Sequence, residues 1–129
     1  MRTPRSGTSR LVLTVCLLCA GCAAINEVCT AIGCTSVLTV QFTSPPAIAY
    51  HLQALSVENG AVDFDCPDPA KCPVAELRDY APDKLVLTVT TARGSAQYNL
   101  SPQYTPHYPN GKRCGAACRT GSVTVALPE

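Results

Sequence analysis

The sequence predicts an all-β fold, a small antiparallel β-sandwich held by disulfides. Apolar residues recur at every second position in six or seven short segments, which is the period of a strand with one buried face. Turn signals rich in Gly, Pro and Asn separate these segments, and no sustained helical stripe follows residue 22. Six cysteines remain beyond that point, which suits a domain of roughly one hundred residues with a modest core.

The predicted strands cover 38–43, 50–57, 62–66, 85–90, 96–100 and 122–127. The first ends at Pro45 and Pro46, because proline cannot donate to a central ladder. Asn59-Gly60 predicts a tight turn between the second and third strands, since both residues tolerate positive φ angles. Arg93-Gly94 joins the two runs that make the clearest hairpin in the chain.

Two further stretches are predicted mainly as loops. Residues 67–84 contain four prolines, and we expect at most one short strand or helical turn near 74–80. Residues 101–121 contain three prolines, and we expect a long loop with at most one edge strand around 102–105. The architecture is immunoglobulin-like by analogy only, because the chain has no Trp and so lacks the Cys…Trp…Cys signature. A small barrel is the alternative.

The N-terminus has the pattern of an export signal. Arg2, Arg5 and Arg10 precede the apolar run Leu11–Ala20, and no acid lies among them. At ~1.5 Å per residue this run is too short to cross a hydrocarbon core of ~30 Å. A basic region, a short apolar region and small residues at its end are typical of a secretory signal peptide. We therefore assign 1–21 to a signal peptide, with cleavage before Cys22.

The end of this segment, Ala20-Gly21-Cys22, resembles the lipobox of bacterial lipoproteins, with Cys19 where that motif usually has Leu. The resemblance covers only the first 22 residues. It implies that Cys22 carries a diacylglyceryl group with palmitate-type chains, which hold the protein on a membrane. The Ala23 that follows, in place of Asp, implies the outer membrane in a Gram-negative cell. Without acylation, the protein would be a soluble secreted domain. In the lipoprotein interpretation, residues 22–33 form a lipidated stem, and 34–129 form the β-sandwich domain.

The cysteine count agrees with this processing. Cys16 and Cys19 leave with the signal peptide and Cys22 is lipidated, so an even number remains for an oxidising compartment. Those remaining are Cys29, Cys34, Cys66, Cys72, Cys114 and Cys118. We predict the pair Cys66–Cys72, because the Pro-Asp-Pro-Ala-Lys between them must turn. The other four can pair locally or crosswise. Their spacings do not match the usual zinc motifs, so no metal and no cofactor are predicted.

Charge limits the class of partner. Removal of the three signal-peptide arginines leaves seven of the ten Lys and Arg residues and all nine Asp and Glu residues, a net charge of −2. A mildly acidic surface argues against nucleic acid, which requires a basic face. The predicted partners are the membrane, through the N-terminal lipid, and an envelope protein or glycan.

Acids and histidines are the residues that could carry chemistry. Asp63, Asp65 and Asp68 lie close together, but the EF-hand Gly and Glu are missing, so solvated acids are the preferred interpretation. His51 and His107 could serve a small envelope hydrolase, the alternative function, although no Gly-x-Ser-x-Gly elbow is present. We therefore predict no catalytic residues.

Tyr104, His107 and Tyr108 are the candidate binding residues. They lie on a proline-stiffened loop, and tyrosine side chains lose little entropy on contact. Lys112, Arg113 and Arg119 give this end of the domain a local positive character. The sequence therefore predicts a non-enzymatic binding or structural module anchored at the cell envelope, which acts through residues 101–120.

Overall fold

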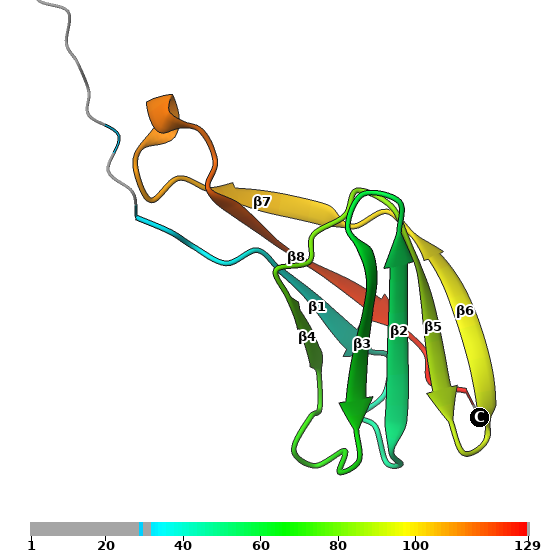
Figure 1. The fold of residues 1–129 in the computed structure, drawn as a ribbon. Coiled ribbons are helices and arrows are strands. Elements are labelled where there is room, and N and C mark those ends of the chain that lie inside the picture. The colour runs from blue at the N-terminus through cyan, green and yellow to red at the C-terminus, as the bar shows by residue number, and fades with distance from the viewer. Residues whose placement is uncertain (1–28, 30–31, 129) are drawn as a thin grey trace, which may run out of the picture.

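The computed structural model describes Cys29 and residues 32–128. Its strands are β1 (Val37–Phe42), β2 (Tyr50–Ser56), β3 (Gly60–Cys66), β4 (Ala75–Arg78), β5 (Leu85–Thr91), β6 (Gly94–Leu100), β7 (Gln103–His107) and β8 (Cys118–Val125). They form two four-stranded sheets, ordered β4-β1-β8-β7 and β3-β2-β5-β6, which pack as a sandwich (Figure 1). The predicted β-sandwich is confirmed. The signal peptide and Cys22 lie outside the described residues.

The core lies between the sheets and consists of the residues that the alternation places inward. Leu38 and Val40 from one sheet face Leu52 and Leu87 from the other, and all four are fully buried. Because every second side chain of a strand points to the same face, one face of each sheet becomes apolar. The opposite faces carry mostly polar side chains, with Leu55 as an exposed apolar exception. No helix long and apolar enough to cross a membrane occurs among Cys29 and residues 32–128.

The strand pairing departs from the predicted pattern at one place. β1 and β8 are parallel, with Val37 opposite Thr120 and Phe42 opposite Val125. The other strand pairs are antiparallel, as predicted. The parallel pair places β1 and β8, the first and last strands of the domain, side by side in the middle of one sheet.

The stretch predicted as a long loop contains more sheet than expected. β7 extends to His107, and β8 begins at Cys118, four residues before the predicted start. Only the connection between them is irregular, and it includes a short 3₁₀ turn over Lys112–Cys114. The short strand that the sequence allows near 74–80 is β4, which pairs with β1.

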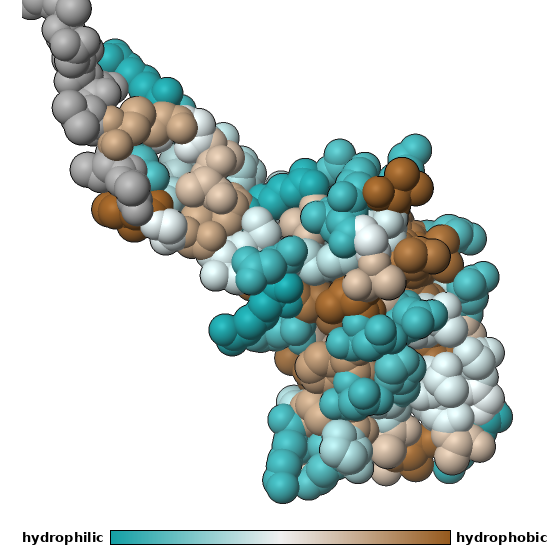
Figure 2. Space-filling model, in the orientation of Figure 1, coloured by the Kyte–Doolittle hydropathy of each residue, from teal (hydrophilic) through white to brown (hydrophobic). Residues whose placement is uncertain are grey.

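A lobe projects from one end of the sandwich. It consists of the N-terminal arm, Cys29 and 32–36, and the β7–β8 connection, 108–117 (Figures 1 and 2). The disulfide Cys29–Cys114 joins its two parts, and the disulfide Cys34–Cys118 joins the arm to the first residue of β8. We call these residues the clamped lobe.

Candidate functional site

The two disulfides of the clamped lobe are both crosswise. Cys29 pairs with Cys114, and Cys34 pairs with Cys118, across sequence separations of 85 and 84. The sequence leaves local and crosswise pairing open for these four cysteines, and the structure has the crosswise arrangement. The arm that leads to the N-terminus is therefore fastened to the β7–β8 connection.

Within the clamped lobe, the Asn110 side chain makes hydrogen bonds to the main chain of Ile32 like those of a neighbouring strand. The Asn110 amide oxygen accepts a hydrogen bond from the Ile32 N–H at 3.0 Å, and its nitrogen donates to the Ile32 carbonyl at 3.0 Å. Both main-chain groups of Ile32 are satisfied in this way, as they would be in a β-ladder. The Ile32 side chain itself is 56% exposed.

The tip of the clamped lobe is basic. Its 3₁₀ turn carries Lys112 and Arg113, and it is flanked by Gly111 and Gly115 at φ angles of 88° and 80°. These φ values lie in the left-handed region, which glycine adopts without steric cost. Tyr108 is 38% exposed on the same connection. The described part of the lobe contains no acidic residue, so basic and partly apolar groups share one surface.

Tyr104, one of the candidate binding residues, points into the molecule. Its hydroxyl donates a hydrogen bond to the Pro82 carbonyl at 2.9 Å. The guanidinium of Arg119 covers the ring, with its central carbon 4.5 Å from the centroid. Burial raises the pKa of the Tyr104 phenol to about 12, although the positive charge of Arg119 opposes the rise. Tyr104 thus connects structural elements.

His107 lies on the opposite face of β7 from Tyr104, because their positions differ by an odd number. Its Nε2 is 2.8 Å from the Thr120 hydroxyl on β8. Tyr108 follows the end of the strand, where its carbonyl accepts a hydrogen bond from Gly111 N–H at 3.0 Å. The three candidate residues therefore do not form one cluster. Tyr108 belongs to the clamped lobe, and the other two do not.

Arg119 does not add to the positive end of the domain in the way expected. Its guanidinium is 2.7 Å from the Asp83 carboxylate and also donates to the Ala81 carbonyl. Its main-chain N–H donates to the Ser36 hydroxyl at 3.1 Å. The carboxylate neutralises its charge locally, so Arg119 does not act as a separate positive charge at this end.

A second polar cluster lies on the outer face of the other sheet. His51 on β2 sits between two carboxylates of β3, with Nδ1 2.7 Å from Asp65 and Nε2 3.2 Å from Asp63. The hydrogen bond to Asp65 is the largest effect on His51 and raises its pKa. Desolvation opposes this rise, and the charges of Asp65 and Asp63 add smaller increases. An open hollow beside His51 is lined by Tyr50, Asp65, Cys66, Pro67, Thr90 and neighbouring residues.

This geometry limits the chemistry that His51 can perform. Both ring nitrogens face carboxylates, so in this arrangement neither is placed to accept a proton from a hydroxyl nucleophile. The nearby hydroxyls of Thr90 and Ser95 lie 3.2 Å from each other. Asp63 and Asp65 also lie next to different ring nitrogens of His51. A metal ion bound to one of these nitrogens would therefore have only one of the two carboxylates beside it. No group of three His, Cys, Asp or Glu side chains within the described residues is arranged to hold a metal ion.

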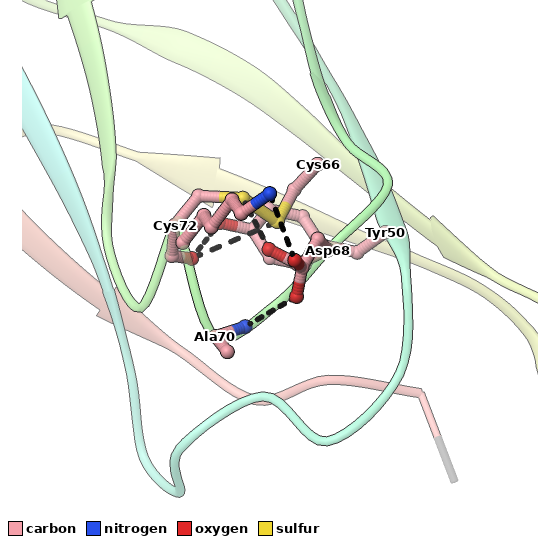
Figure 3. The surroundings of a disulfide bond; sticks show 6 residues. Tyr50, Cys66, Asp68, Ala70 and Cys72 are labelled. Carbon is pink, nitrogen blue, oxygen red and sulfur yellow. Dashed lines mark hydrogen bonds and ion pairs between the residues drawn. A yellow bond between two sulfur atoms is a disulfide. The ribbon is translucent and has the colours of Figure 1, made fainter.

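Asp68 builds a turn instead of joining the other two acids. Its carboxylate accepts a hydrogen bond from Ala70 N–H at 3.2 Å (Figure 3). Its carbonyl accepts one from Lys71 N–H at 3.0 Å. The predicted disulfide Cys66–Cys72 closes this turn. The Tyr50 hydroxyl donates to the Cys72 carbonyl at 2.8 Å and ties the turn to β2.

Sequence reasoning missed the contact between Tyr104 and Gly121. A Cβ at Gly121 would lie 2.7 Å from the Tyr104 ring and 2.7 Å from the Gln103 carbonyl. The signal was present, because a glycine inside a strand often marks the close approach of another group. Asn110 belongs to a predicted turn, and no pattern in the sequence indicates its hydrogen bonds to Ile32.

Comparison with protein-family models, with curated proteins and with solved structures finds no match to this chain.

Proposed function

We propose that the protein is a lipid-anchored, non-enzymatic binding module of a bacterial envelope, and that the clamped lobe carries its contact surface. The multiple disulfides suggest an extracytoplasmic protein. The lipid anchor is inferred from the resemblance of the segment ending at Cys22 to a lipobox. The outer membrane is the favoured site if the cell is Gram-negative.

The observation that carries this proposal is the disulfide Cys29–Cys114. Only residues 23–28 separate Cys22 from Cys29. A chain of this length spans at most ~25 Å even when fully extended. Because Cys29 is fastened to the β7–β8 connection, an acylated Cys22 would keep the clamped lobe close to the bilayer. Its exposed Tyr108 and its basic tip would then meet membrane-proximal partners first.

The anchor is tested by intact mass of the membrane-extracted protein. We expect an N-terminal Cys22 with a diacylglyceryl group and a gain of six protons on reduction, for the three bridges. Cys22→Ser should move the protein from the membrane fraction to the soluble fraction and leave the bridges intact. An unmodified N-terminus in the membrane-extracted protein would contradict the anchor.

The contact surface is tested by co-sedimentation of the unanchored Cys22→Ser protein with isolated envelope membranes and with purified cell-wall glycan, so that the lipid does not contribute to retention. We expect Lys112→Glu and Tyr108→Ala each to weaken retention. Lys71→Glu is a matched control, since Lys71 is 84% exposed and lies in the turn after β3, outside the clamped lobe. If the control weakens retention as much as Lys112→Glu, net charge and not the clamped lobe determines binding.

A small envelope hydrolase is the second candidate, because the Asp65–His51 pair lies beside an open hollow. In that case His51 would act as a general base once its Nε2 is released from Asp63. Ester hydrolysis by the wild-type protein, lost in His51→Gln and kept in His107→Gln, would support this function. Equal rates in all three proteins would reject it.

A further inference from the structure

The four outer strands of the sandwich differ in how well they are protected against pairing. β3 and β6 are the edges of one sheet, and β4 and β7 are the edges of the other. Native proteins protect exposed edges with charges, proline, short length or bulges, since an edge presents unpaired main-chain groups. An edge without these features is a surface on which another strand can be added.

Three of the four edges carry such protection. β3 carries the exposed acids Asp63 and Asp65. β4 has only four residues, and its exposed positions are Glu76 and Arg78. β7 contains Pro106, which has no N–H to offer to a partner.

β6 has none of them. Its sequence, Gly-Ser-Ala-Gln-Tyr-Asn-Leu, contains no charge and no proline over seven residues. Each of the seven pairs with β5 in one unbroken register, so no bulge bends the strand. Within the described residues, β5 is the one strand that pairs with β6. β6 forms the side of the molecule away from the clamped lobe (Figure 1), so the lobe does not cover it.

The residues of β6 complement a second copy of the same strand. When two copies pair antiparallel about Gln97, all seven residues find partners. Ser95 then lies opposite Asn99 of the other copy, and the two Gln97 amides face each other on the exposed side. On the half-buried side, the small Ala96 lies opposite the large Tyr98. Cross-strand pairs of this kind stabilise a sheet, and no like charges meet.

From this contrast between edges we infer that the protein forms a two-fold dimer by antiparallel pairing of β6 with β6 of a second copy. The pairing extends the sheet to eight strands and adds about six main-chain hydrogen bonds. It uses the unprotected edge of both copies. The remaining edges of the joined sheet are the two acid-bearing β3 strands, so the assembly closes as a dimer and does not grow into a fibre.

The two-fold axis reverses the direction of the second copy. The two clamped lobes therefore leave the dimer at opposite ends, and pairing does not cover either of them. The dimer does not depend on the lipid anchor or on the ligand of the lobe.

The test is sedimentation equilibrium of the exported, mature protein in density-matched detergent. We expect wild type to have twice the monomer mass. Gln97→Lys places two like charges at the two-fold axis and should weaken dimerisation about three- to fivefold. Gln97→Glu should do the same. A mixture of the two variants should regain the dimer, because a lysine then faces a glutamate across the axis.

Gln53→Lys is the matched control, since Gln53 is also exposed on the same sheet face but lies on the inner strand β2. It should leave dimerisation unchanged. A wild-type monomer at millimolar concentration, a species larger than a dimer, or a dimer indifferent to Gln97→Lys would each overturn the proposal. So would failure of the mixed variants to associate, because the residues opposite each other would then differ from those inferred.

Discussion

Arg119 on β8 lies over the ring of Tyr104 on β7, and both side chains bind the segment 81–83. Arg119 contacts the Asp83 carboxylate and the Ala81 carbonyl, while the Tyr104 hydroxyl donates to the Pro82 carbonyl between them. Residues 81–83 join β4 in one sheet to β5 in the other. The two side chains therefore hold the connection between the sheets against β7 and β8, at one edge of the sandwich.

We expect Tyr104→Phe to lower the free energy of unfolding by about 1 kcal/mol, because a half-buried carbonyl loses its hydrogen-bond donor. Tyr108→Phe is the control, since the Tyr108 side chain is partly exposed and lies in the clamped lobe. It should change stability by less than about 0.5 kcal/mol. Urea unfolding followed by tyrosine fluorescence measures both. Equal losses in the two variants would show that the Tyr104 hydroxyl has no special structural role.

Gly121 should not tolerate a side chain. A methyl group there would meet both the Tyr104 ring and the Gln103 carbonyl at 2.7 Å, and the carbonyl belongs to the main chain and cannot turn aside. We expect Gly121→Ala to cost about 2–3 kcal/mol of unfolding free energy through overpacking. Gly33→Ala is the matched control, because nothing lies within 4 Å of the position that its methyl group would take. Thermal unfolding should separate the two variants by several degrees, and similar melting temperatures would contradict the predicted clash.

The two crosswise disulfides should not contribute independently. In the chain-entropy description, one of them closes a loop of 85 or 84 residues and stabilises the fold by about 4–5 kcal/mol. The second then closes only a ring of about nine further residues, which is worth about 2–3 kcal/mol. Replacing either pair by alanines should therefore cost about 2–3 kcal/mol, and replacing both should cost about 7 kcal/mol.

Urea unfolding of the two double variants and the quadruple variant measures this coupling. The Cys66–Cys72 pair supplies a reference, because it closes a separate loop with a separation of six and should add independently. If the losses from the two crosswise pairs simply add, the N-terminal arm is held in place by contacts other than the disulfides.

The sequence predicted the sandwich well because its strands are short, alternating and separated by turns. Leu85, Leu87 and Val89 are buried as the period of two requires. β7 was the weak point, since Pro106 and the exposed positions around it are typical of a loop. β7 buries little of its surface, with Tyr104 its one half-buried side chain, so it needs few apolar residues and its alternation is faint.

The candidate site was less predictable, because its contacts join residues far apart in the chain. Ile32 and Asn110 are 78 residues apart, and Ser36 and Arg119 are 83 apart. Composition groups Tyr104, His107 and Tyr108 together, but the strand geometry of β7 separates them onto different faces. Likewise, the alternation assigns Asp63 and Asp65 to solvent, although His51 on the neighbouring strand lies between them.

His51 should make stability depend on pH near neutrality. The carboxylates of Asp65 and Asp63 raise its pKa in the folded protein above the ordinary value of 6.5. A group with a raised folded-state pKa stabilises the fold fully below its unfolded pKa. That contribution is lost as the pH rises through the folded pKa. We therefore expect the urea midpoint of wild type to fall, relative to His51→Gln, as the pH rises above the ordinary histidine pKa of 6.5. The effect should be small, because the His51 side chain is 38% exposed and solvent screens its charge.

His107→Gln is the control, since the described structure gives His107 a hydroxyl partner and no carboxylate. It should keep the pH dependence of wild type. NMR titration should place the pKa of His51 above its ordinary value of 6.5, and Asp65→Asn should lower it by removing the main hydrogen-bond acceptor for the charged ring. If wild type and His51→Gln respond to pH identically, the two carboxylates do not hold the imidazolium in the folded protein. The cluster would then be a set of independently solvated side chains.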